Sequence, residues 1–349
     1  MKPYYEIFSE DIQSVIKTGM SILSDFPESR KSLMRLMSHL PVASKRRDQW
    51  MKKDIVVPPL LIISTTESCN LNCAGCYARS NHGDVDKEIP KEKIDDLMEQ
   101  AIQAGCCIVL LAGGEPLMCN DWLDVVASHS ELLGLVFTNG TILNNERADW
   151  FAENRNMIPL FSIEGDAKAT DERRGSGVAE RVEHAMRLLT ERALPFGVSL
   201  TVGEHNIEDI LRQDFIDTLV PLGCRLFIFP EYVPAAPNEK LHMLSEESKL
   251  KLQDFCRKIS KEKKLILIPF PGDESEYGGC LAAGRGFVHI SVFGELEPCP
   301  FAEYSDRNVY ETSLIDALAS SLLSKIRSES HLLKEGAGGC ALRGLNWTV

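Results

Sequence analysis

Short apolar runs alternate with amphipathic stretches from Pro58 onward. Six of the runs are typical of buried strands, at residues 60–63, 108–111, 135–137, 158–163, 196–202 and 225–229. Apolar positions at helical spacing follow them over 90–104, 121–130, 144–154, 178–192, 207–220 and 244–262. Buried strands joined by helical crossovers pair in parallel. Because six units are too few for a closed eight-fold barrel, residues 58–264 predict a partial (β/α)6 barrel or an open parallel sheet. A ligand should bind at the carboxyl ends of the strands.

The segments before and after the barrel lack the alternation of strands and helices. Residues 1–57 predict a helical extension, with apolar positions at helical spacing over 12–23 and 33–40. The basic residues at 45–47 and 52–53 then indicate a connector, either a solvated linker or a docking site for an acidic partner or membrane surface. Residues 265–349 predict a small α+β domain with a loop over 269–279, a β-hairpin over 287–297 and a helix over 312–329.

Composition narrows the class of protein. The 349 residues are 44% hydrophobic and carry a net charge of −13, which supports a sizeable core and disfavours general nucleic-acid binding. No apolar run reaches the length of a transmembrane segment, and no basic stretch leads into an apolar one at the N-terminus. We therefore expect a cytoplasmic protein.

Eleven cysteines are an odd count for a protein of a reducing compartment, where thiols more often bind metal or react than form disulfides. Cys69, Cys73 and Cys76 form a CxxxCxxC loop directly after the first strand of the barrel. Three thiolates on one loop can hold three irons of a four-iron cube and leave the fourth iron open. The alternative is a zinc site, with His82 as the fourth ligand of a Cys3His set.

With these cysteines placed after the first strand, residues 58–343 resemble the radical SAM superfamily. The resemblance implies an oxygen-sensitive enzyme in which Cys69, Cys73 and Cys76 bind a [4Fe–4S] cluster whose open iron chelates S-adenosylmethionine (SAM). Reductive cleavage of SAM would release a 5′-deoxyadenosyl radical that abstracts hydrogen from a substrate. An electron donor such as flavodoxin or ferredoxin would reduce the cluster.

The loops after strands two, three and four resemble the SAM-binding positions of that superfamily. After the second strand, two glycines permit close backbone approach to a ligand, and an adjacent carboxylate can accept from an ammonium group. An arginine further along can pair with the SAM carboxylate. The matching residues are Gly113, Gly114, Glu115, Pro116, Thr138, Asn139, Ser162, Glu164 and Arg174.

The cluster loop departs from the family at one position. The residue before the third cysteine is usually aromatic and contacts adenine, whereas this chain has Gly75. The next residue, Tyr77, is our candidate to make the adenine contact instead.

A second group of cysteines, Cys280, Cys299 and Cys340, flanks the expected hairpin and resembles the SPASM extension, or its short twitch form. The resemblance implies one auxiliary [4Fe–4S] cluster. Where the family closes with a CxxC pair, Ala337 and Arg343 stand on either side of Cys340, so three thiolates remain unless Cys256 or an oxygen ligand joins them. The auxiliary cluster could then have an open iron that binds substrate, be sealed by a carboxylate, or be absent. Structural thiols and a zinc site are the alternatives to any cluster.

The substrate is the least determined part of the prediction. Glu231 and Tyr232, at the end of the sixth strand, are the candidate substrate contacts. By analogy with SPASM and twitch enzymes, the first hypothesis is modification of a peptide or protein, and the second is maturation of a tetrapyrrole or another small cofactor. A non-catalytic iron–sulfur electron carrier or a zinc-binding protein is the hypothesis from a different class.

Overall fold

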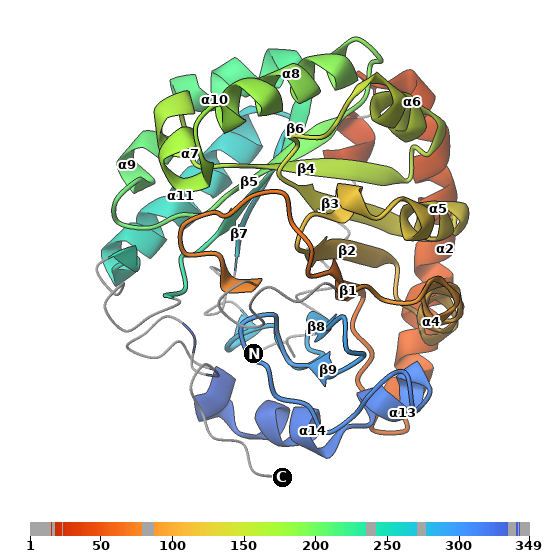
Figure 1. The fold of residues 1–349 in the computed structure, drawn as a ribbon. Coiled ribbons are helices and arrows are strands. Elements are labelled where there is room, and N and C mark those ends of the chain that lie inside the picture. Colours follow the sequence, from red (N-terminus) through yellow and green to blue (C-terminus); the bar gives the residue numbers. More distant parts are fainter. Residues whose placement is uncertain are drawn as a thin grey trace.

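Within the described residues, nine strands form one continuous sheet in the computed structural model of the chain (Figure 1). The structure describes residues 15, 18–22, 24–78, 87–234, 242–270, 277–333, 340 and 342. The strands are β1 (Leu60–Thr66), β2 (Ile108–Gly113), β3 (Leu133–Thr138), β4 (Met157–Ile163), β5 (Phe196–Leu200), β6 (Cys224–Pro230), β7 (Ile266–Phe270), β8 (Phe287–Ile290) and β9 (Leu296–Glu297). Their order is β7-β6-β5-β4-β3-β2-β1-β8-β9, and only β8 and β9 pair antiparallel.

The six parallel strands β1 to β6 confirm the predicted α/β architecture. The sheet continues beyond them at both ends, because β7 pairs with β6 and β8 pairs with β1. We had assigned the run at 266–270 to the C-terminal domain, since Pro269 and the loop residues after it argue against a central strand. The structure resolves the conflict by placing β7 at the edge of the sheet, where a strand tolerates proline. The domain boundaries themselves stay a prediction.

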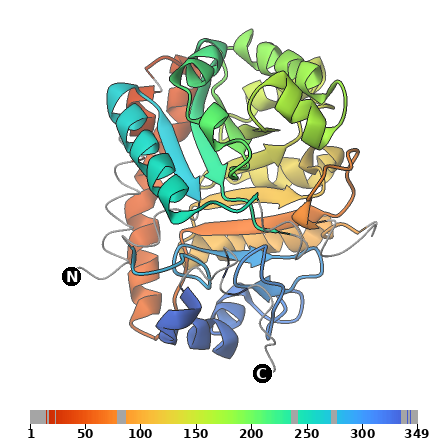
Figure 2. The same cartoon turned by 90° about the vertical axis from the view of Figure 1, so that its left-hand side faces the viewer.

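Helices surround the curved sheet (Figures 1 and 2). They are α2 (Pro27–Met51), α4 (Lys91–Ala104), η1 (Pro116–Met118), α5 (Asn120–Ser128), α6 (Asn145–Glu153), α7 (Ala167–Arg174), α8 (Val178–Thr190), α9 (Ile207–Ile210), α10 (Gln213–Leu219), η2 (Val220–Leu222), α11 (Glu246–Glu262), α13 (Leu314–Leu318), α14 (Ser321–Ser328) and η4 (Ser330–Leu333). Two predicted helices are broken in the structure. The helix expected over 207–220 divides at Arg212, whose backbone is extended, and the one over 312–329 divides at Ser320, whose hydroxyl caps α14. None of the helices in the described part of the chain combines the length and apolar character that crossing a bilayer requires.

The prediction of a basic connector was wrong. Helix α2 runs through residues 45–47, and its inward side packs Leu36 and Ala43 against Cys107 near the amino ends of β2 and β3. The guanidinium groups of Arg46 and Arg47 donate to the carbonyls of Ile102 and Gly105, at 2.7 and 2.5 Å. The last carbonyls of a helix have no partner within it, so these two arginines satisfy the carboxyl end of α4.

The inner face of the sheet carries an apolar cluster of its own. Leu135, Leu160 and Ile228 are buried in it, and seven half-buried side chains complete it: Ile108, Leu110, Leu133, Phe137, Ile158, Leu226 and Phe270. On β2 these positions alternate with Val109 and Leu111, which belong to the main core between sheet and helices. We call this group the inner apolar cluster. Because most of its members retain exposed surface, the inside of the barrel offers apolar contact area to a ligand.

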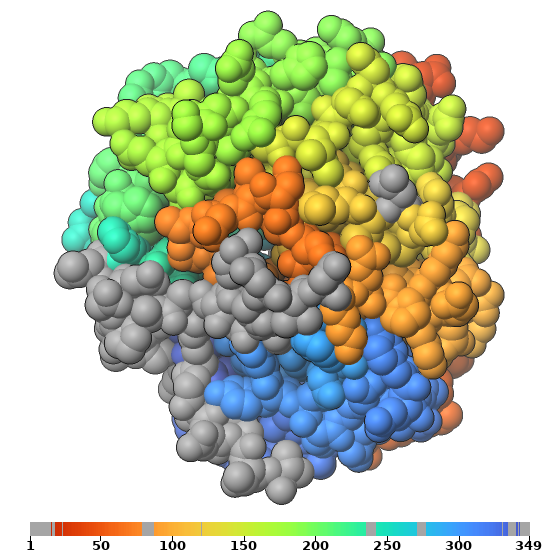
Figure 3. All heavy atoms as spheres, in the orientation of Figure 1, coloured from red at the N-terminus to blue at the C-terminus, as the bar shows by residue number. Residues whose placement is uncertain are grey.

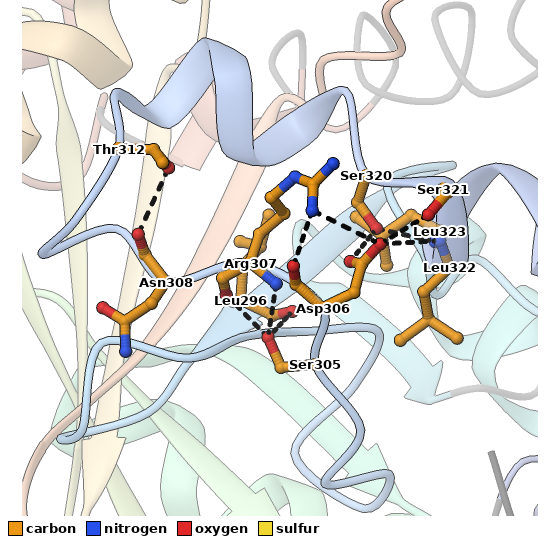
Figure 4. A network of polar contacts seen from close by, with 10 residues as sticks. All are labelled: Leu296, Ser305, Asp306, Arg307, Asn308, Thr312, Ser320, Ser321, Leu322 and Leu323. Atoms are coloured by element: carbon orange, nitrogen blue, oxygen red, sulfur yellow. Dashed lines mark hydrogen bonds and ion pairs between the residues drawn. The ribbon is translucent and has the colours of Figure 1, made fainter. Parts of the chain in front are cut away.

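The segment after β7 folds back onto the first strand. The hairpin of β8 and β9 confirms the predicted pairing, with His289 opposite Glu297. Asp306 fastens this segment to α14 by accepting from the hydroxyls of Ser320 and Ser321 and from the Leu322 backbone (Figure 4). The polar contacts hold the loop after Cys299 against the helices that follow it.

Candidate active site

The three-cysteine loop follows β1 at the carboxyl edge of the sheet, as the sequence predicted for the ligand site. Cys69, Cys73 and Cys76 are half-buried and none forms a disulfide. In the space-filling view, the orange segment that contains this loop lies between the yellow-to-green part of the barrel and the blue C-terminal segment (Figure 3). The loop therefore lies where the barrel meets the C-terminal segment.

Gly113 and Gly114, at the end of β2, pack closely against the backbone that precedes the three-cysteine loop. The Gly114 amide donates to the Thr66 carbonyl at 2.6 Å, and the Glu115 amide donates to the Ser68 carbonyl at 2.8 Å. A Cβ on Gly114 would lie 2.1 Å from the Ser68 oxygen, and one on Gly113 would lie 2.4 Å from the Thr66 oxygen. From the sequence we expected these glycines to admit a ligand. In the structure the close approach is to the backbone that leads into Cys69.

Glu115 joins the loops after β2 and β3. Its carboxylate is buried and accepts from the Leu117 amide at 3.0 Å, the Thr138 hydroxyl at 2.6 Å and the Asn139 amide at 2.7 Å. Burial raises the pKa of this carboxyl, and the three donors oppose the rise. Three protein donors leave little free capacity for the ammonium group that we expected it to bind.

Asn139 ties the β3 loop directly to the cluster loop. Its amide nitrogen donates to the side-chain oxygen of Asn70 at 2.8 Å and lies 3.9 Å from the sulfur of Cys69. The Asn70 amide in turn donates to the Thr141 hydroxyl at 2.8 Å. This small network fixes the first cysteine relative to β3.

Glu164, directly after β4, forms the charged part of the site. One carboxylate oxygen accepts from Arg173 and Arg174, each at 2.7 Å, while the other is buried and has no hydrogen-bond partner among the residues that the structure describes. The backbones of Arg173 and Ala74 also pair, since the Ala74 amide donates to the Arg173 carbonyl at 2.9 Å. The carboxyl end of α7 is thereby fastened to the cluster loop, and one buried acceptor is left available for a ligand.

Burial and the nearby charges shift the pKa values of the cysteine thiols in the loop. Burial raises the pKa values of Cys69 and Cys73, and the guanidinium groups of Arg174 and Arg173 counteract the rise at Cys73. Positive charge beside a thiol favours the thiolate, which is the form that binds metal. The described residues contain no group of three or more His, Cys, Asp and Glu side chains suited to a single metal ion. His82, the fourth ligand in the zinc alternative, lies outside the described residues.

The other candidate residues of the barrel, Pro116, Ser162 and Glu231, differ in burial and in the partners they face. Pro116 begins η1 and is buried, and Ser162 is half-buried on β4 beside Ser199 of β5. Glu231 points away from the cluster loop, toward Lys249 on α11 with 3.7 Å between oxygen and nitrogen. The structure therefore does not bring Glu231 to the other candidate residues.

Two tyrosines flank the cluster loop on different sides. Tyr77 packs its ring on Phe301 with 4.9 Å between centroids, and burial together with the thiols of Cys76 and Cys299 raises the pKa of its hydroxyl. Tyr232 instead faces Gly75, because a Cβ on that glycine would lie 3.2 Å from the Tyr232 hydroxyl oxygen. Tyr232 thus borders the space that an aromatic side chain at position 75 would enter, whereas Tyr77 is engaged with the C-terminal segment.

The second cysteine group lies in that segment. Cys299 is buried just after β9, and Cys280 and Cys340 are half-buried. The Cys280 amide donates to the Leu333 carbonyl at 2.6 Å, which holds the start of this segment against η4. The neighbours of Cys340 at 337 and 343 lie outside the described residues, as do residues 271–276 of the predicted loop.

Sequence reasoning missed two histidines and undervalued one arginine. His205 and His242 lie close together beside Tyr232, and Arg173 joins Arg174, the candidate partner of the SAM carboxylate, in an ion pair with Glu164. The only available signal was position, because His205 follows the fifth strand at the edge where ligands bind. His242 has no such signal, since it precedes a helix.

These features define a class: an α/β enzyme domain with three thiols and a charged acceptor at the carboxyl edge of a parallel sheet. Residues 63–215 match the family model of the radical SAM superfamily, so this part of the chain is a radical SAM domain. It is 27% identical over 280 residues to the AdoMet-dependent heme synthase of Methanosarcina barkeri, covering 73% of this chain and 80% of that protein.

Two further comparisons involve a bacteriocin-biosynthesis protein and a protein solved with bound S-adenosylmethionine. The chain is 26% identical over 308 residues to the antilisterial bacteriocin subtilosin biosynthesis protein AlbA of Bacillus subtilis, covering 80% of this chain and 66% of AlbA. The structure of Streptococcus suis SuiB bound to S-adenosylmethionine superposes with a TM-score of 0.66 at 18% identity, covering 82% of this chain and 71% of SuiB. The last similarity concerns the fold.

The radical SAM domain means that the protein is a radical SAM enzyme, which uses a [4Fe–4S] cluster and SAM. Two observations in this chain fit those groups. Three thiols share one loop, as a cluster with an open iron requires, and Glu164 keeps one buried oxygen unpartnered next to them.

Proposed function

We propose that Cys69, Cys73 and Cys76 ligate the cluster and that SAM binds between this loop and the ends of β2 to β4. The observation that carries the assignment is the unpartnered oxygen of Glu164, which is buried beside Cys73 and ready to accept from a ligand. When bound and reduced, the cluster supplies one electron that cleaves SAM and produces a 5′-deoxyadenosyl radical. The side chains and backbone of the protein bind SAM and hold the cluster loop in position.

Each candidate residue has a distinct part in this proposal. Glu164 accepts from the ribose hydroxyls of SAM, and Arg174 pairs with its carboxylate. Gly113 and Gly114 keep the cluster loop in place, while Glu115, Thr138 and Asn139 join that loop to β3. Tyr77, from which the sequence leads us to expect the adenine contact, packs on Phe301, and Tyr232 borders the space beside Gly75.

We also propose an auxiliary cluster held by Cys280, Cys299 and Cys340. Its support is the relation to SPASM-type enzymes and the position of Cys280 and Cys299 in the segment after β7, where the Cys280 amide pairs with the Leu333 carbonyl. The contact between Tyr77 and Phe301 would connect the two cluster regions through a buried aromatic pair. A flavodoxin or ferredoxin of the cytoplasm would supply the electron.

A tetrapyrrole is the substrate class that we favour. The inner apolar cluster offers half-buried aliphatic and aromatic surface inside the barrel, which suits the apolar face of a macrocycle. The heme synthase of M. barkeri matches the greater part of both chains, which agrees with this class. Modification of a peptide is the second candidate, and its support is the relation to AlbA.

Anaerobic reconstitution tests the proposal in two steps. The wild-type protein should bind iron and sulfide and should produce 5′-deoxyadenosine from SAM when a reductant is added. About eight irons per chain correspond to two four-iron clusters and about four to one. Transfer of deuterium from a labelled porphyrin or a labelled peptide into 5′-deoxyadenosine would then identify the hydrogen donor. Zinc without iron would refute the assignment of the three cysteines.

A further inference from the structure

Three polar aromatic side chains meet at the carboxyl edge of the sheet, outside the residues assigned above to the cluster. His205 follows β5, Tyr232 follows β6, and His242 precedes α11. Ring centroids are 4.7 Å apart for His205 and His242, 5.8 Å for Tyr232 and His242, and 6.4 Å for His205 and Tyr232. All three pairs meet edge-on, so the rings pack against one another and present their edges outward.

The backbone holds this arrangement in place. A Cβ on Gly203 would lie 2.3 Å from the His242 carbonyl oxygen and 2.8 Å from Nδ1 of His205, so only glycine fits between them. The Glu204 amide donates to that same carbonyl at 3.1 Å, and the Tyr232 amide donates to Val202 at 2.8 Å. The histidines are therefore positioned by the fold and do not meet by chance contact of mobile side chains.

The group spans the distance from solvent to the cluster loop. Both imidazoles are exposed, whereas Tyr232 is only 9% exposed and its hydroxyl approaches Gly75. A ligand held by the imidazoles would have its remaining atoms over the carboxyl edge of the barrel, where the inner apolar cluster begins.

The charges around the group favour an anion. The pKa of His205 is lowered by partial burial, by the neighbouring His242 and by the Arg173 guanidinium. Glu164 opposes this change only weakly, because two arginines neutralise its charge. The carboxylate of Glu204, the residue before His205, accepts from the Ser245 amide at 2.6 Å. Two imidazoles and a phenol are hydrogen-bond donors, and a carboxylate restores the protonation that the positive surroundings suppress.

We propose that His205, His242 and Tyr232 form a subsite that binds a carboxylate group of the substrate. The inference rests on the proposed function, and it deepens it: the macrocycle lies on the inner apolar cluster, and one acidic side chain at its rim is held by these three donors. The subsite selects for a free carboxylate over its ester and sets the orientation of the substrate relative to the cluster loop.

Binding of a carboxylated porphyrin tests the subsite directly. Coproporphyrin III and its tetramethyl ester are titrated anaerobically into the reconstituted full-length protein, and binding is followed by porphyrin absorbance. The acid should bind at least tenfold more tightly than the ester, because a hydrogen bond to a charged group is stronger than one to a neutral group. His205→Gln and His242→Gln should each lose about tenfold for the acid and little for the ester.

The matched control is His184→Gln, which removes an exposed histidine from α8. It should bind the acid as the wild type does. Equal binding of the acid by wild type and both histidine variants would overturn the subsite and leave the proposed substrate class intact. Absence of porphyrin binding to the wild type would overturn the substrate class instead.

A second measurement then decides the subsite independently of any porphyrin. The imidazole resonances of His205 are titrated with pH in the presence and absence of propionate, which supplies the carboxylate alone. Propionate should raise the pKa of His205 in the wild type and not in His242→Gln. An unchanged pKa at saturating propionate would overturn the inference.

Discussion

Replacing Glu164 by glutamine tests the charged part of the site. The side chain is 3% exposed, and one of its oxygens accepts from both Arg173 and Arg174. Glutamine keeps the shape and one acceptor oxygen but removes the charge. The change therefore separates the electrostatic contribution of this residue from its packing.

The magnitude follows from the burial of the three groups. Breaking a buried ion pair by removing one partner costs about 3–5 kcal/mol. The arginine side chains are 20% and 12% exposed and the amide still accepts one bond, so we expect about 3 kcal/mol of lost unfolding free energy. With its oxygen held by the arginines, the amide places an NH2 donor where the unpartnered oxygen was, so this acceptor is lost and SAM binding weakens by about 10- to 100-fold.

Two measurements and a control read out the effects. Calorimetric titration of SAM into the anaerobically reconstituted protein gives the affinity, and denaturant unfolding gives the stability. Glu231→Gln is the matched control, since Glu231 is also a buried carboxylate with one unpartnered oxygen but faces Lys249 on α11. It should lose stability and bind SAM normally. Equal SAM affinity in Glu164→Gln and wild type would refute the role of Glu164.

The other predictions concern the supports of the two cysteine groups. Gly114→Ala forces a Cβ to 2.1 Å from the Ser68 oxygen, so it should lower the free energy of unfolding by about 1–3 kcal/mol and reduce the iron bound after reconstitution. Gly19→Ala, whose Cβ lies 3.7 Å from Leu33, is the control and should bind iron normally. For Asp306, burial favours a raised pKa, but the Ser320 and Ser321 hydroxyls and the Leu322 amide outweigh it and lower the pKa. Asp306→Asn should therefore cost about 1 kcal/mol in denaturant unfolding above pH 4, and the difference from wild type should vanish as pH falls through the folded-state pKa; a difference that is constant with pH contradicts this. Cys299→Ala should lower iron content by about half while uncoupled SAM cleavage persists, and unchanged iron would exclude the auxiliary cluster.

Much of the barrel was predictable because its strands are short apolar runs separated by helical periodicity. The cluster loop was predictable too, since CxxxCxxC after the first strand is a local pattern. The edges of the sheet were not. Whether β8 pairs with β1 depends on contacts more than two hundred residues apart, and Pro269 made β7 look like a loop. Local periodicity carries no information about such pairing.

The candidate site shows the same division between local and distant information. The loops that contain Glu115 and Glu164 were identified from short motifs, but their partners were not. The meeting of Tyr232 with Gly75 and the contact of His205 with His242 join the ends of different strands, and the reach of Arg173 to Glu164 depends on how α7 packs after β4. Likewise, Arg46 and Arg47 looked like a solvated linker because the carbonyls they satisfy belong to another helix.

The central claim is that the loop after β1 holds an iron–sulfur cluster able to cleave SAM, and one comparison tests it most directly. Wild type and Cys73→Ala are reconstituted without air, reduced, and assayed for the paramagnetic cluster signal and for 5′-deoxyadenosine. We expect the wild type to show a signal that changes when SAM is added and to form 5′-deoxyadenosine, and the variant to do neither. Undiminished formation of 5′-deoxyadenosine by Cys73→Ala would contradict the account.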